Sequence, residues 1–129
     1  QAGFDPRSLV EAGIRPVAGA ADLHAAREAA ARVEVAPAVM AYLVDICRAT
    51  RTSPAVRLGV SPRGATALLR TSRVWAFLQG RGFVTPDDVK TMAPSTLAHR
   101  LGLRAEANLE GITAVNVISG VLAATPVPR

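Results

Sequence analysis

The stretch LGVSPRGATALLR, residues 58–70, begins the longest helix that the sequence predicts. Ser61 is a preferred N-cap residue and Pro62 suits the first helical position, so the pair forms a strong start signal. Arg63 follows in the first turn, where the positive end of the helix dipole disfavours a cation by about 0.3–1 kcal/mol. A strong helix start signal is therefore followed by a residue whose positive charge interacts unfavourably with the helix dipole.

The helix that begins at Pro62 is predicted to run to about Gly80 and to have two unlike faces. A 3.6-residue spacing assigns to its core face Ala65, Leu68, Leu69, Ser72, Trp75 and Ala76. The opposite face carries Arg63, Arg70, Arg73 and Arg81, with Val74 and Phe77 between them. We expect Trp75, the only tryptophan, to be buried against an earlier helix, on Val39, Leu43 or Ile46.

Helical periodicity also extends to both sides of this segment. Further helices are predicted over residues 19–33, from Pro37 to 50–53, from Pro86 onwards and over 113–124, after a short turn at 4–12 that ends at Gly13. The core faces of the first two carry Leu23, Ala26, Ala30 and Val33, and then Val39, Tyr42, Leu43, Ile46 and Cys47. Pro94 is expected to interrupt or split the helix that contains it. Residues 54–59 are expected to be a loop, residues 33–35 a short strand and residues 99–103 extended.

Composition agrees with a helical fold. Half of the 129 residues are hydrophobic but only 4% are aromatic, so alanine, valine and leucine must provide the packing. The length suits one domain with a real core. We therefore predict an all-α bundle, with a minimal pair of short strands as the only sheet it could hold.

The formal net charge of +5 is the difference between 15 basic and 10 acidic residues, and Lys90 is the only lysine among the basic ones. Such a skew toward arginine is more readily explained by a GC-rich coding sequence than by a nucleic-acid surface, although it is compatible with an anionic partner. No run is long and apolar enough to span a bilayer, and no signal peptide is visible. The chain opens with Gln1, which suggests a piece of a longer protein, and a cytoplasmic location is the default expectation.

Catalytic constellations are mostly absent. His24 and His99 are isolated, and Cys47, the only cysteine, falls on an apolar stripe as a small core residue would. Asp87 and Asp88 are explained by the first turn of a helix, where the dipole favours acids. The chain has neither a zinc-ligand spacing nor a G-x-x-x-x-G-K-[ST] phosphate loop. We therefore expect that this polypeptide alone is not an enzyme.

Arg63 is the exception. A helix N-terminus already offers free N–H groups and a positive dipole end to an anion, and arginine adds a bidentate fork for phosphate. The alternative is a solvated arginine without function, and the chemistry alone does not separate the two interpretations.

A resemblance favours the first interpretation. From Phe4 to Arg129 the chain resembles the C-terminal part of the MoxR-type AAA+ ATPases. The stretches that carry the resemblance are RPVAGAADL (15–23), YLVDICRATR (42–51), LGVSPRGATALLRTSRVWAFLQGR (58–81), FVTPDDVKTMAPSTLAHRL (83–101) and NLEGITA (108–114). The segment at 59–63 matches the sensor 2 motif of that family position by position. One departure is Gly64, which follows the arginine where the family often has alanine.

The resemblance implies a lid-type helical bundle at residues 19–129, preceded at residues 1–18 by a linker from a large ATPase domain. It implies that Arg63 is the sensor 2 arginine, that Ser61 and Pro62 belong to the same nucleotide-binding segment, and that no residue of the fragment is catalytic. ATP and Mg²⁺ would be bound by the parent protein, an oligomeric ring with chaperone-like remodelling activity, and neither is expected on the fragment itself. Its partners would be the large ATPase domain, neighbouring subunits and, as a further candidate, a protein with a von Willebrand factor A domain.

Two other interpretations remain open at this point. The basic face with Phe77 among its arginines could bind nucleic acid, which is not favoured, or the long helix could dock another protein. Salt-dependent binding to random DNA would support the former, because phosphate contacts release counterions.

Overall fold

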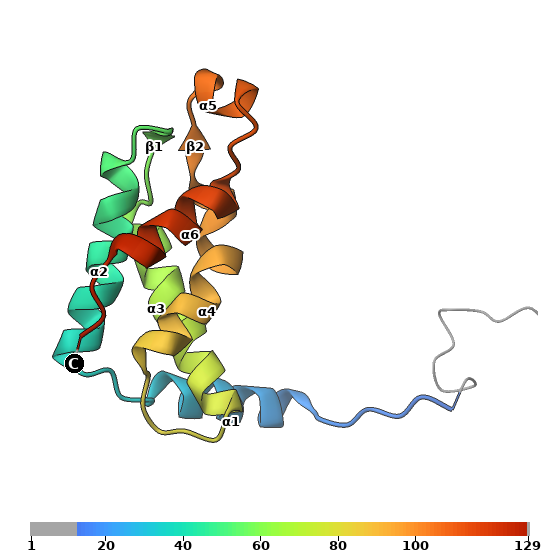
Figure 1. Ribbon diagram of the computed structural model, residues 1–129. Coiled ribbons are helices and arrows are strands. Elements are labelled where there is room, and N and C mark those ends of the chain that lie inside the picture. The colour runs from blue at the N-terminus through green and yellow to red at the C-terminus, as the bar shows by residue number, and fades with distance from the viewer. Residues whose placement is uncertain (1–12, 129) are drawn as a thin grey trace, which may run out of the picture.

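The computed structural model describes residues 13–128 (Figure 1). Its elements are α1 (Ala20–Ala31), α2 (Pro37–Thr52), β1 (Val56–Leu58), α3 (Pro62–Leu78), α4 (Pro86–Leu97), the 3-10 helix η1 (Ala98–Arg100), β2 (Gly102–Leu103), α5 (Ala105–Leu109) and α6 (Ala114–Ala124). The predicted all-α fold with a minimal strand pair is confirmed. The short turn predicted between Phe4 and Ala12 lies outside the described residues.

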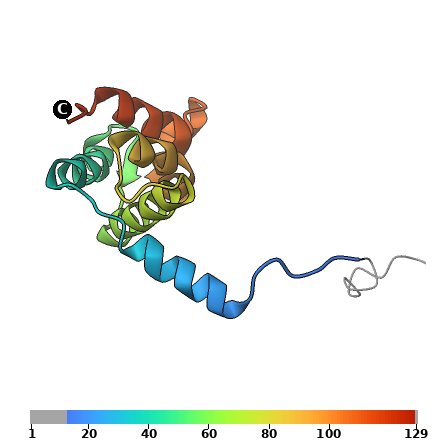
Figure 2. The same ribbon diagram turned by 90° about the horizontal axis from the view of Figure 1, so that it is seen from below.

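Helix α3 is the centre of the bundle. It packs against α1, α2 and α4, while α6 covers α2 and α4. Figures 1 and 2 show that α3 and α4 run antiparallel, so the start of α3 and the end of α4 lie at the same end of the molecule. Three residues spaced by four, Leu68, Ser72 and Ala76, are fully buried. That spacing places one narrow stripe of α3 in the core.

Helix α2 follows its sequence pattern closely. All five of its predicted core residues are buried, and the helix ends at Thr52 as expected. Helix α1 also forms, but the prediction that Leu23 lies on its core face is wrong. Leu23 is 59% exposed, whereas Ala30 and Val33 are buried. The reason is that only the last turn of α1 meets the core.

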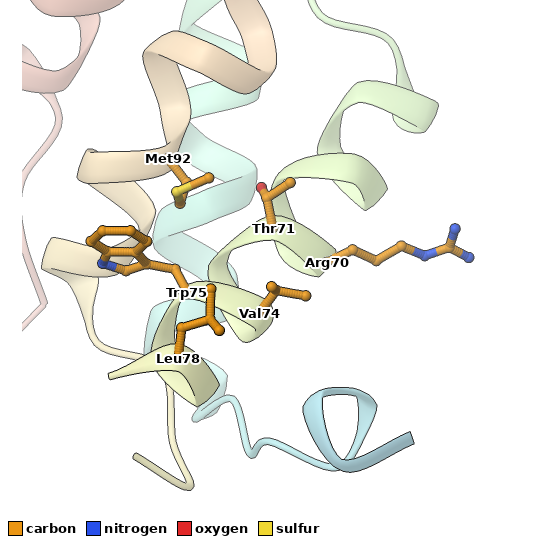
Figure 3. A pocket seen from close by; sticks show the side chains of 6 residues that line it. All are labelled: Arg70, Thr71, Val74, Trp75, Leu78 and Met92. Carbon is orange, nitrogen blue, oxygen red and sulfur yellow. The ribbon is translucent and has the colours of Figure 1, made fainter. Parts of the chain in front are cut away.

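Trp75 does not lie where we predicted. It is half-buried and stands beside Met92 of α4, in a shallow hollow of about 210 Å³ shared with Val74 and Leu78 (Figure 3). One residue along an α-helix turns the side chain by about 100°. Because Ala76 occupies the centre of the buried stripe, Trp75 is turned toward the edge of α4. Its expected burial against α2 is therefore wrong.

Four further local predictions need correction. Pro94 neither ends nor splits α4. Buried residues on both sides of it, Ala93, Thr96 and Leu97, hold the helix together despite the lost hydrogen bond.

The other three corrections concern extended segments. The loop expected at 54–59 contains β1, which pairs antiparallel with β2. Of the extended segment expected at 99–103, only β2 is extended, because the chain first makes the turn of η1. The strand expected at 33–35 is a single parallel bridge between Glu34 and Phe83.

Helix α5, the short element between β2 and α6, was not predicted. Its five residues are too few to display a helical period.

An ion pair between the half-buried Arg81 and the buried carboxylate of Asp88 fixes the turn between α3 and α4. Arg81 donates from Nη1 to Oδ2 of Asp88 over 2.7 Å and from Nη2 to Oδ1. Thr85 donates to the same carboxylate from its backbone N and its Oγ1, at 2.7 and 2.9 Å. Burial would raise the pKa of Asp88, but the hydrogen bonds from Arg81 and Thr85 outweigh it and hold this pKa below its usual value.

We predict that Asp88→Asn lowers the free energy of unfolding at pH 7 by about 1–3 kcal/mol, because a charge-assisted bond in a buried site is lost. A carboxyl group with a lowered pKa stabilises the fold above its unfolded pKa of about 3.9, and the contribution disappears as the pH falls through the lower, folded value. Urea unfolding between pH 7 and 3 should therefore show a shallower pH dependence in the variant. Asp87→Asn, at an exposed position of the same turn, is the control, and equal effects of both changes would contradict the prediction.

Candidate functional site

The segment before α3 is seated on the last turns of α2. A Cβ built on Gly59 would lie 2.8 Å from Cα and 2.6 Å from Cγ of Arg51, so only glycine fits this close approach. Val60 is fully buried, and its N–H donates to Oγ1 of Thr50 over 3.0 Å. Nε of Arg51 donates to the carbonyl of Val60, also over 3.0 Å. The chain therefore enters α3 from a fixed position.

The next residues start the helix as the sequence predicts. Oγ of Ser61 accepts a hydrogen bond from the N–H of Gly64 over 3.3 Å, and Pro62 occupies the first turn. Gly64 is buried, and a Cβ there would lie 2.6 Å from Cγ1 of Val60. Packing therefore explains the glycine at position 64: the absence of a side chain permits the close contact with Val60 that holds the helix start to the core.

Arg63 is the one residue of this segment that no packing contact explains. It is exposed, and among residues 13–128 it forms neither an ion pair nor a side-chain hydrogen bond. No acidic residue stands in the first turn of α3 to offset its charge. The cation predicted at the helix start is therefore present, with no counter-charge among the residues that the structure describes.

A surface hollow of about 680 Å³ lies beside Arg63 along α3. Its lining residues are Arg63, Thr66, Ala67, Arg70, Thr71 and Arg100. Arg100 belongs to η1, so two separate elements contribute arginines to one hollow without a carboxylate among the lining residues. Sequence reasoning missed Arg100, because only the antiparallel packing of α3 and α4 brings it to the start of α3.

The rest of the predicted basic face does not form one free surface. Arg81 is paired with Asp88, and Phe77 packs against the core. Arg73 is half-buried, and its Nε is buried without a hydrogen-bond partner among residues 13–128. Arg70 remains exposed and points away from Trp75 and Met92 (Figure 3). A continuous track of four arginines around an aromatic side chain is therefore absent from the described face.

The other candidates for chemistry have ordinary roles. His24 is exposed beside Glu28, His99 is exposed on η1, and Asp87 pairs with Lys90 on the surface. Burial raises the pKa of the Cys47 thiol to about 11, so it remains protonated at neutral pH. No group of three metal-ligating side chains occurs within the part of the chain that the structure describes.

The helices between residues 13 and 128 include none with the length and hydropathy that a membrane crossing requires.

Comparison with known proteins places this arrangement in a family. The model of the AAA lid domain matches residues 48–121, more than half of the chain. The uncharacterized protein YeaC of Bacillus subtilis is 37% identical over 115 residues, which are 89% of this chain and 36% of that protein. Protein MoxR of Methylorubrum extorquens is 35% identical over 121 residues, covering 78% of this chain and 35% of its own length.

Two further comparisons agree. Chaperone MoxR1 of Mycobacterium tuberculosis is 32% identical over 117 residues, 84% of this chain and 31% of the relative. A crystal structure of a candidate ATPase from Cytophaga hutchinsonii superposes with a TM-score of 0.85 at 23% identity, over 100% of this chain and 45% of the other, and so supports the fold.

The chain belongs to the AAA lid domain family. The particular resemblance to MoxR-type AAA+ ATPases is also confirmed, by relatives that carry the MoxR name. The chain spans about a third of the length of these curated relatives.

We predict that Gly59→Ala lowers the free energy of unfolding by about 1–3 kcal/mol, because the new methyl group must displace the backbone of α2. Gly120→Ala is the matched control. Gly120 lies within α6 with open space around it, so alanine should there raise stability by up to about 1 kcal/mol. Urea unfolding of both variants measures these changes in stability. An unchanged midpoint for Gly59→Ala would show that the contact between residue 59 and α2 tolerates a side chain.

Proposed function

We propose that this chain is the nucleotide-sensing lid of a MoxR-type AAA+ ATPase and that Arg63 acts as its sensor 2 arginine. One observation carries the proposal: Arg63 stands in the first turn of α3 without a partner among the described residues, although its neighbours in the motif all have structural roles. A local rule broken without visible compensation is typical of a functional position. The compensation would be an anion supplied from outside this domain.

The geometry of the helix start suits phosphate. The first N–H groups of a helix and its dipole attract an anion, and a guanidinium adds two parallel donors. Ser61 and Pro62 would serve this site indirectly, by fixing where α3 begins. When the lid closes on a nucleotide, Arg63 would pair with its phosphates, so that the nucleotide state sets the position of the lid.

ATP and Mg²⁺ would belong to the complete ATPase. The free arginine at the start of α3 fits a phosphate group, whereas the described residues hold no cluster of carboxylates for a magnesium ion. We therefore assign the metal and the hydrolysis of ATP to a large ATPase domain. This chain would contribute the contact that reports whether the nucleotide is bound, and would not be catalytic itself.

The proposed partners follow from this role. The lid, residues 19–129, would move against the large domain and neighbouring subunits of an oligomeric ring, with residues 1–18 as the connection. Chaperone-like remodelling would be the activity of the whole assembly, in the cytoplasm, and a protein with a von Willebrand factor A domain is a further candidate partner. Residues 13–18 show no regular secondary structure, which is compatible with a connecting role.

We predict two opposite effects of Arg63→Ala. In the 129-residue chain, the free energy of unfolding should stay unchanged or rise by at most about 1 kcal/mol, because an unfavourable dipole contact is removed. In the complete ATPase, turnover should fall about tenfold or more, because a charge-assisted phosphate contact is lost. Thermal melting and a steady-state ATPase assay measure the two.

Arg48→Ala provides the control, because Arg48 is an exposed arginine of α2 that does not line the hollow. It removes the same charge and should leave turnover unchanged. Wild-type turnover in Arg63→Ala would reduce Arg63 to a solvated surface residue.

A further inference from the structure

Two elements distant in sequence bring arginines to one hollow. Arg63 comes from the first turn of α3 and Arg100 from η1, and both line the same 680 Å³ depression. The antiparallel packing of α3 and α4 puts these two chain segments at one end of the bundle (Figure 1). Arg70, about two helical turns further along α3 than Arg63, lines the same hollow.

Arg100 is held in place by its neighbours. Its Nε donates to the carbonyl of Thr96 over 3.1 Å, and its side chain is half-buried. Its Cδ lies near the start of α3, 3.5 Å from where a Cβ of Gly64 would be. Its aliphatic stem is therefore fixed beside the helix start while one of its three guanidinium nitrogens is used within the protein.

The charges around this hollow are unbalanced. No carboxylate lines it, and no ion pair among residues 13–128 includes Arg63, Arg70 or Arg100. Like charges that face one depression repel each other, and a bound polyvalent anion would replace this repulsion with electrostatic attraction. The guanidinium group of Arg100, which its hydrogen bond to Thr96 partly orients, also loses less freedom on binding than that of a free surface side chain would.

We infer that Arg100 is a second phosphate-binding residue, which together with Arg63 clamps the polyphosphate chain of a nucleoside triphosphate. The inference rests on the proposed function and extends it, since the phosphate site then includes η1 as well as the start of α3. A polyphosphate suits the hollow better than a single phosphate, because its charges are spread along a chain and can meet forks from two elements. Duplex DNA fits less well, because Arg81 is neutralised by Asp88 and does not extend the basic surface.

The test uses the 129-residue chain with inorganic tripolyphosphate as the probe, at low ionic strength, by isothermal titration calorimetry. ATP and AMP are titrated in parallel, and a random-sequence DNA duplex is the competing polyanion. Arg100→Ala and Arg63→Ala should each weaken tripolyphosphate binding about tenfold or more, as expected for the loss of a charge-assisted contact. Arg48→Ala, with the same change in net charge, should bind like the wild type.

Arg100→Lys separates position from charge. It keeps the cation but loses the Nε–H bond to Thr96, so its affinity should lie between those of the wild type and Arg100→Ala. AMP should bind at least tenfold more weakly than ATP. Melting curves of each variant exclude unfolding as the cause of a loss.

The other outcomes overturn the clamp. Wild-type affinity in Arg100→Ala together with a loss in Arg63→Ala would remove Arg100 from the site and leave the proposed function of Arg63 intact. No detectable binding of tripolyphosphate to the wild-type chain, or tighter binding of the DNA duplex than of ATP, would contradict the clamp. The proposed function is tested separately, by the turnover of Arg63→Ala in the complete ATPase.

Discussion

The close approach of Gly59 to the backbone of α2 positions the central helix of the bundle. It allows Val60 to be buried and to bond with Thr50 and Arg51, and this fixes the position from which α3 departs. Because α3 packs against α1, α2 and α4, its starting position sets the arrangement of the bundle. The same contact between residues 59–60 and α2 also fixes the position of Arg63 at the surface. The packing of the core and the position of the candidate site therefore depend on one contact.

Two arginines of this chain show how differently a charge can be used. Arg81 is paired with a buried carboxylate and fixes the turn between α3 and α4, so its charge is balanced within the domain. Arg63 stands at the positive end of a helix with no such partner in the described part of the chain. The first arrangement is complete within the domain, whereas the second leaves a cation without a counter-charge among the described residues. This difference supports the interpretation of Arg63 as a sensor of a bound nucleotide.

The sequence predicted those features that depend on local chemistry. The N-cap at Ser61, the acidic first turn at Asp87 and Asp88, the apolar period of α2 and the cation in the first turn of α3 were all predicted. Features that depend on how helices meet were not. Trp75 is turned toward Met92 because the narrow buried stripe of α3, formed by Leu68, Ser72 and Ala76, excludes it from the core face. Arg100 reaches the candidate site only through the antiparallel packing of α3 and α4, which no local pattern encodes.

In the proposed function, the partner of Arg63 is a nucleotide phosphate. A structure of the complete ATPase with a non-hydrolysable ATP analogue tests it most directly, through the distance between the Arg63 guanidinium and the phosphate oxygens. We expect the Arg63 guanidinium to donate a hydrogen bond of about 3 Å to a phosphate oxygen. An Arg63 that remains in solvent, or that pairs with a carboxylate of the large domain while the nucleotide is bound, would contradict it.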